Sequence, residues 1–224
     1  MIRRQLFILL TMLTCVTSIV AQVSFDVSVV EKRRIVTGTQ DFQKSDDVIF
    51  ANALLWAVNE GPGRKEEIVD CDFVKRQFSM VYHLQREGEE AYTCRLGVKV
   101  AQGKLVFLVS EVKVQGGLLS SFVSFDRLNP EKKAKHQDII NDFQALNNQK
   151  LLSLFSFVGD YSPKITNWKN VCMNRIDRGM SADEVRLIYG KPINIQSDGT
   201  KVQYMYSSFV YVFMENDTVA SFVN

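Results

Sequence analysis

The chain has 224 residues, of which 46% are hydrophobic and 23% charged, and this composition is typical of a globular protein with one or two cores. It carries 27 basic against 25 acidic side chains. Proteins that bind nucleic acids need a basic surface to displace the counterions of the phosphates. The near balance of charge therefore excludes nucleic acid from the partners that we expect.

The first residues predict a cleavable export signal over 1–21. Arg3 and Arg4 precede an apolar run from 6 to 20, and the small residue Ala21 closes it. The run is shorter than the roughly 18 residues expected of a membrane-spanning helix. We therefore expect cleavage, no transmembrane span afterwards, and a location in the periplasm, at the periphery of the outer membrane or outside the cell. Cleavage leaves 25 basic against 25 acidic side chains.

The cysteines predict neither lipidation nor a disulfide. Cys15 lies deep inside the apolar run, which disfavours a lipoprotein signal. Cys71, Cys94 and Cys172 remain after cleavage, an odd number. A simple hairpin places Cys94 opposite about Val81, which is too far from Cys71 for a bridge. We expect free, largely buried thiols, because small buried thiols are common in protein cores.

The first elements are a strand and a helix. Alternating apolar residues over 23–38 predict one strand. Ser45 is placed to cap a helix that begins with Asp46 and Asp47 and carries an apolar stripe at helical spacing. Gly61-Pro62-Gly63 predicts the end of this helix.

A β region and a second helix follow. Residues 67–115 predict three or four antiparallel strands, with turns at Glu87-Gly88 and Gln102-Gly103. Asn129 as N-cap and Pro130 at the first helical position predict the start of a long amphipathic helix that lies across the sheet.

Glycine and proline residues between 159 and 163 predict a domain boundary. We expect an antiparallel-sheet α+β domain with two helices over 22–160, and a small domain of two helices and three strands over 165–224. The predicted helices of the small domain are 168–176 and 181–189, and its predicted turns are 198–199, 207–208 and 216–217. The predicted fold class is α+β, with two domains that each pack an antiparallel sheet against helices.

The stretch IDRGMSADEVRLIYGKP (176–192) is the most motif-like in the chain. Ser181 and Glu184 have the spacing of a capping box. Gly179 permits a tight turn before the helix, Gly190 can adopt the left-handed conformation after it, and Pro192 prevents its continuation. Each of these residues has a structural role, and none is placed as a nucleophile or a base.

These residues, with the aromatic hairpin that follows them, resemble the small protein A/outer-membrane lipoprotein A family over 168–224. The family includes an envelope component that assists β-barrel assembly. Its fold, two short helices against a three-stranded antiparallel sheet, is shared by β-lactamase-inhibitory proteins. The resemblance implies an accessory role in outer-membrane assembly, although this chain lacks a lipobox and has an additional domain in front.

The front domain resembles an exported domain of unknown function from Bacteroides-type bacteria with a TATA-binding-protein-like (TBP-like) fold. The order of elements, the helix with Trp56 and the helix with Pro130 carry this resemblance. A shared fold does not imply DNA binding, because function depends on the site rather than on the fold.

No motif for catalysis is present. His83 and His136 are the two histidines, and His83 with Cys94 or Cys71 is a conceivable pair, but no nucleophile motif supports it. The acidic pairs Asp46-Asp47, Glu66-Glu67 and Glu89-Glu90 match no metal-binding spacing. We therefore expect no catalytic residue, metal or cofactor.

The aromatic run around Tyr204, Tyr206, Phe209 and Tyr211 is the candidate binding surface, because both faces of its strands are largely apolar. It can pack on the front domain, bind an external partner or line a small-ligand groove. We expect a non-catalytic exported envelope protein that binds a protein or an envelope component. The alternatives are a secreted hydrolase that uses Cys94 or His83, and an inhibitor of a secreted enzyme.

Overall fold

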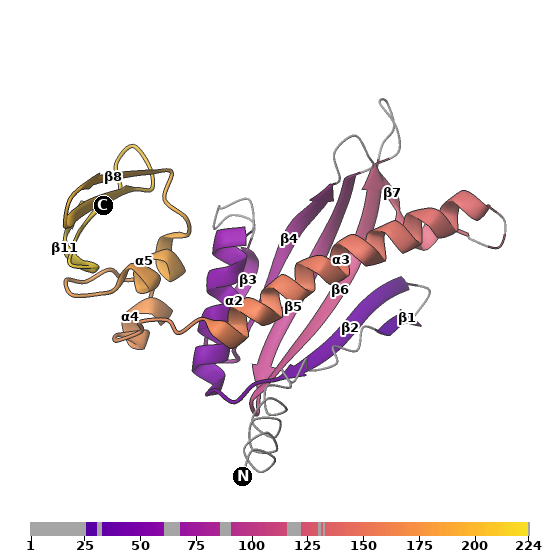
Figure 1. Ribbon diagram of the computed structural model, residues 1–224, viewed down its shortest axis with the longest axis horizontal. Coiled ribbons are helices and arrows are strands. Elements are labelled where there is room, and N and C mark those ends of the chain that lie inside the picture. Colours follow the sequence, from indigo (N-terminus) through magenta and orange to yellow (C-terminus); the bar gives the residue numbers. More distant parts are fainter. Residues whose placement is uncertain are drawn as a thin grey trace, which may run out of the picture.

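A computed structural model describes residues 26–30, 33–60, 68–85, 91–115, 122–129, 131 and 133–223. It shows helices packed on two separate antiparallel sheets, which confirms the predicted α+β class (Figure 1). We refer to residues 26–160 as the first unit and to residues 161–223 as the second unit. The division into domains at 22–160 and 165–224 stays a prediction, and the export signal over 1–21 lies outside the described residues.

Seven strands form the sheet of the first unit. They are β1 (Asp26–Val30), β2 (Arg33–Asp41), β3 (Ile68–Asp72), β4 (Gln77–Gln85), β5 (Ala91–Ala101), β6 (Lys104–Gln115) and β7 (Phe122–Ser124). Their spatial order is β1-β2-β6-β5-β4-β3, and β7 pairs with one end of β6. The predicted turn at Gln102 and Gly103 is confirmed, with φ of 56° and 72°. The predicted turn at Glu87-Gly88 lies outside the described residues.

The single strand predicted over 23–38 is wrong. Strands β1 and β2 pair with each other in antiparallel fashion, with Val30 opposite Arg33. Alternation of side chains is the same in both arms of a hairpin, so periodicity alone does not show that the chain reverses.

Helix α2 (Asp46–Glu60) is confirmed, but it is buried all round instead of along one stripe. Every residue from Ile49 to Val58 is buried, including Asn52. The sheet, helix α3 (Ala134–Asp160) and the second unit surround α2, and this explains the loss of an exposed face (Figure 1). The predicted stop at Gly61-Pro62-Gly63 lies outside the described residues.

Helix α3 crosses the same face of the sheet but begins later than predicted. Its N-cap is Lys133, whereas Asn129 precedes the helix and Pro130 lies outside the described residues. The backbone N–H of Asn129 donates to His136 Nδ1 at 2.8 Å. This contact folds the preceding segment, which contains the short 3-10 helix η2 (Phe125–Arg127), back onto the first helical turn.

The C-terminal end of α3 is anchored to α2 and the residues before it. Lys44 Nζ and Asn52 Nδ2 both donate to the carbonyl oxygens of Val158 and Tyr161, at 2.7–3.0 Å. These two side chains therefore satisfy carbonyls that have no partner within the helix, and the ammonium group complements the negative end of the helix dipole.

The other face of the seven-stranded sheet has no helix over it in the part of the chain that the structure describes (Figure 1). Val106 and Leu108 on this face are each 41% exposed. None of the described helices is long and apolar enough to span a bilayer.

The second unit contains helices α4 (Trp168–Cys172) and α5 (Ala182–Tyr189) and strands β8 (Asn194–Asp198), β9 (Lys201–Met205), β10 (Tyr211–Glu215) and β11 (Thr218–Val223). The sheet order is β11-β10-β9-β8, which makes four strands where three were expected. Every residue of β8 is exposed, so this strand lacks an apolar pattern. The turns predicted near 198–199, 207–208 and 216–217 are present and separate the four strands.

Helix α4 is shorter than the predicted 168–176 and joins the two units. It ends at Cys172, and Asn174 adopts a left-handed conformation with φ of 52° that stops the helix. The Trp168 ring makes edge contacts with Phe50 of α2 and with Phe73, at centroid distances of 6.2 and 5.6 Å. This aromatic cluster fixes the second unit against the first.

Candidate functional site

The residues of the conceivable hydrolase do not meet. Cys94 is buried beneath the helices, whereas His83 is exposed and contacts Thr93 at 3.1 Å. Tyr82 lies opposite Cys94 and His83 lies opposite Thr93, so the thiol and the imidazole point to opposite faces of the sheet. The Cys94–His83 pair is therefore not assembled.

The Cys94 environment suppresses its reactivity. Burial raises the pKa of the Cys94 thiol to about 12, and a hydrogen bond with Tyr82 opposes this shift only in part. The Tyr82 hydroxyl itself donates to Asn147 Oδ1 of α3. Because the thiolate is the nucleophilic form, this cysteine is inert at neutral pH.

The other two cysteines differ from the expected burial. Cys71 is half-buried and lies opposite Phe78, so it is not near Cys94, whose partner in the sheet is Tyr82. Cys172 is a free thiol and is exposed, because it ends the short helix α4 on its solvent side. The expectation that the thiols are largely buried is wrong for Cys172.

The acidic pair at the start of α2 has a structural role. Asp46 accepts hydrogen bonds from the backbone N–H groups of Gln102 and Gly103, at 3.1 and 2.7 Å. Asp47 accepts one from Arg76 Nε at 2.6 Å. The pairs Glu66-Glu67 and Glu89-Glu90 lie outside the described residues. Among the described side chains, no three His, Cys, Asp or Glu residues gather as metal ligands would.

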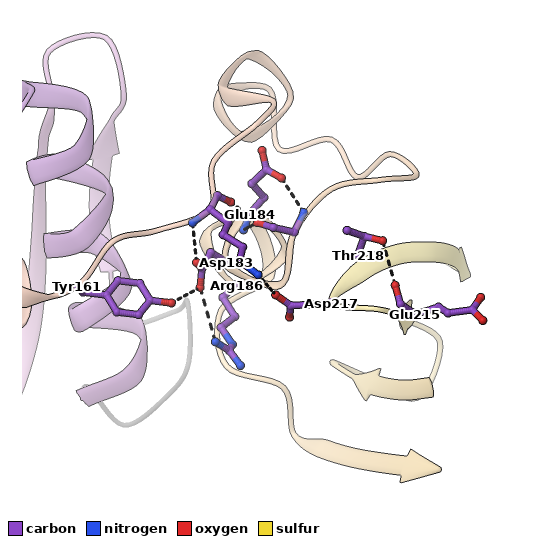
Figure 2. A network of polar contacts seen from close by, with 9 residues as sticks. Tyr161, Asp183, Glu184, Arg186, Glu215, Asp217 and Thr218 are labelled. Atoms are coloured by element: carbon purple, nitrogen blue, oxygen red, sulfur yellow. Dashed lines mark hydrogen bonds and ion pairs between the residues drawn. The ribbon is translucent and has the colours of Figure 1, made fainter. Parts of the chain in front are cut away.

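The motif at 176–192 makes polar contacts with residues 161–167, the segment that links α3 to α4 (Figure 2). The capping box is confirmed: the Ser181 hydroxyl accepts from the Glu184 backbone N–H, and the Glu184 carboxylate accepts from the Ser181 N–H at 2.7 Å. The same carboxylate also accepts from the backbone N–H groups of Thr166 and Asn167. Glu184 therefore holds the segment that links α3 to α4.

Asp183 makes a second set of contacts with this segment (Figure 2). It accepts hydrogen bonds from the Tyr161 hydroxyl at 2.7 Å and from the Lys164 backbone N–H at 3.0 Å. Burial, and then the hydrogen bond to Asp183, raise the pKa of Tyr161 to about 12. Lys164 Nζ also pairs with Asp217 in the β10–β11 turn at 3.0 Å.

Backbone contacts attach the four-stranded sheet to the motif. The N–H of Gly179 donates to the Val219 carbonyl and the N–H of Val219 donates to the Met180 carbonyl, both at 2.8 Å. Gly179 and Gly190 have φ of 82° and 83°, a region that favours glycine, as the motif predicted. The orientation of the sheet is thus set by residues 161–190.

The inner face of this sheet packs on α5. Tyr204 is only 7% exposed, and the Arg186 guanidinium lies over its ring at 6.0 Å. Tyr206 is half-buried between Tyr189 and Tyr204, at centroid distances of 5.2 and 6.4 Å. Burial raises the pKa of Tyr206, and its hydroxyl has no hydrogen-bond partner among the described residues. Two of the four predicted binding residues therefore face the protein itself.

The other two predicted residues lie at one end of the sheet, which we call the apolar end. It consists of Ile193, Met205, Phe209, Tyr211 and Val223. Phe209 is 81% exposed, and the Ser207 hydroxyl fixes its loop by accepting from the N–H groups of Phe209 and Val210. Tyr211 is half-buried. The binding role of the four aromatic residues stays a prediction.

The strand register places further side chains in two rows across the outer face. The middle row is Gln196, Gln203, Phe213 and Ser221, and the charged row at the far end is Asp198, Lys201 and Glu215. A cavity of about 490 Å³ lies over these rows. Its rows form only once four strands are in register, so the one local signal of it in the sequence is the alternation around Phe213.

Comparisons with known proteins support the fold of the first unit. No family model and no curated protein matches the chain. A TBP-like protein from Parabacteroides distasonis aligns with a TM-score of 0.51 and 7% identity, over 61% of this chain and 99% of that one. The first unit has a TBP-like fold. A DUF4468 family protein from Bacteroides ovatus aligns with a TM-score of 0.44 and 13% identity, over 61% of this chain and 94% of that one.

Proposed function

We propose that this protein is a non-catalytic, exported component of the bacterial envelope that binds a protein or another envelope component through the apolar end of its four-stranded sheet. The observation that carries the proposal is the exposure of large apolar side chains there. Phe209, Ile193 and Val223 are 81%, 71% and 57% exposed. Exposed apolar clusters of this kind mark interaction surfaces.

The geometry of the second unit holds this surface in a fixed position, which favours binding. Glu184 and Asp183 hold the linking segment, and Trp168 packs against the first unit, so the apolar end is held on a fixed support. A preformed surface loses little conformational entropy when a partner binds. Export is proposed from the signal-like segment at 1–21, and a role in outer-membrane assembly is proposed from the resemblance over 168–224.

The test is capture of envelope components by the purified protein and by two variants. Phe209→Ser together with Val223→Ser should abolish capture, because the exposed apolar area at the apolar end is lost. Val74→Ser is the matched control, since Val74 is 86% exposed but lies in the first unit. Equal capture by all three proteins, quantified by mass spectrometry after crosslinking, would show that the apolar end is not the binding surface.

A further inference from the structure

The cavity over the middle and charged rows, which we call the outer groove, is a second candidate site on the same sheet. Its volume of about 490 Å³ falls in the range of small-ligand sites. It lies away from the apolar end, because its rows contain the last residues of β8 and β10 and the first residues of β9. No residue of the apolar end lines it.

The polar side chains of the outer groove are available to a ligand. Among the described residues, the side chains of Gln196, Gln203 and Ser221 have no intramolecular hydrogen-bond partner. This contrasts with the motif at 176–192, where Asp183 and Glu184 are fully engaged. Each amide offers both donors and an acceptor, and the hydroxyl offers one donor and two lone pairs.

The charges of the outer groove select against anionic ligands. Lys201 lies between Asp198 and Glu215, which are its neighbours in the register on either side. Two carboxylates against one ammonium group give the groove a net negative charge. A phosphate or carboxylate ligand would be repelled by more charges than attract it.

Phe213 supplies the apolar part of the outer groove. It stands between Gln203 and Ser221 in the middle row, and it is 37% exposed. The groove thus surrounds one aromatic ring with uncharged groups that both donate and accept hydrogen bonds. A ligand that matches this arrangement has an apolar face, hydroxyl groups around its edge and no charge.

We propose that the outer groove binds a neutral oligosaccharide, whose ring C–H face lies on Phe213 and whose hydroxyls pair with Gln196, Gln203 and Ser221. This inference goes beyond the proposed function, because it assigns a second site on the same sheet and names the chemical class of its ligand. A peptide can also form hydrogen bonds with these amides, but it lacks a face of C–H groups ringed by hydroxyls.

The test is a titration of the isotope-labelled protein, followed by amide NMR. Cellotetraose, maltotetraose and chitotetraose are the neutral probes, and tetragalacturonic acid is an anionic probe of similar size. We expect at least one neutral probe to shift the resonances of Gln203, Phe213 and Ser221, and tetragalacturonic acid to bind at least tenfold more weakly. Phe213→Ala should weaken the neutral probe at least tenfold, and Gln203→Ala, a second variant at a half-buried position of the middle row, severalfold.

Phe209→Ser is the matched control, since it removes an exposed aromatic ring outside the groove and should leave sugar affinity unchanged. The inference is overturned if no neutral probe shifts the groove at millimolar concentration, if Phe213→Ala binds as the wild type does, or if a neutral Ala/Ser/Val decapeptide occupies the groove instead. If envelope capture depends on the apolar end while no sugar binds, only the groove assignment is lost. If a sugar binds while capture fails, only the apolar end is wrong.

Discussion

Replacing Glu184 by alanine should destabilise the protein by about 3 kcal/mol, because its carboxylate is a fully buried acceptor for several donors. It accepts from the backbone N–H groups of Ser181, Thr166 and Asn167, and its exposed fraction is 0%. A hydrogen bond to a charged group contributes about 1.5–3 kcal/mol, and a buried donor left without a partner costs about 1–3 kcal/mol.

Not all three donors are expected to carry the full cost. Thr166 is exposed and Asn167 is half-buried, so water can replace the carboxylate at both. Ser181 is only 4% exposed, so water cannot replace the lost carboxylate there, and the Ser181 N–H has no acceptor in Glu184→Ala. The loss of this bond and of the helix cap accounts for about 3 kcal/mol in total. Glu184→Gln should cost about half as much, because one acceptor oxygen remains.

Urea unfolding followed by tryptophan fluorescence measures this cost, since Trp168 lies at the junction of the units. Glu131→Ala is the control: Glu131 is exposed, and its removal should change the free energy of unfolding by less than about 0.5 kcal/mol. A change below about 1 kcal/mol for Glu184→Ala would refute the view that this carboxylate holds the linking segment.

Three further predictions follow from the contacts of single side chains. Lys44→Met should lower the free energy of unfolding by about 1–2 kcal/mol, because it leaves the carbonyls of Val158 and of the C-cap residue Tyr161 with fewer donors; no change in the urea midpoint would contradict this. Iodoacetamide at pH 8, with peptide mapping, should label the exposed Cys172 well before Cys94, whose pKa is about 12. Because the pKa of Tyr161 is raised from 10.0 to about 12, its contribution to stability is complete below pH 10 and is lost as the pH rises through 12. Tyr161→Phe should therefore flatten the fall in melting temperature between pH 10 and 12, and an unchanged slope would count against the Asp183 contact.

The elements predicted best are those with local signals. Helix α5 follows from the capping box of Ser181 and Glu184 and from the positive φ that Gly190 adopts. The turn at Gln102-Gly103 follows in the same way from residue types within one turn. In these cases a few adjacent residues mark where the element begins or ends.

The elements predicted poorly depend on distant contacts. Strand β8 is held in the sheet by pairing with β9 alone, and the late start of α3 coincides with the bond from the Asn129 N–H to His136, which no residue at the predicted N-cap signals. The aromatic residues show the same limit at the candidate site. Nothing near Tyr204 distinguishes it from Phe213, yet helix α5 covers the first and leaves the second at the surface. Whether a helix covers a given face of a sheet depends on tertiary contacts, which local residue types do not reveal.

The packing of Trp168 on the first unit also determines how far apart the outer surfaces of the two sheets lie. The uncovered face of the seven-stranded sheet and the outer face of the four-stranded sheet belong to units that are packed together by Trp168, through Phe50 and Phe73 (Figure 1). Two domains on a flexible tether sample many separations, and a bridging ligand must restrict them at an entropic cost. In this protein that restriction is already in place, so the spacing between the two sheet faces is a property of the fold.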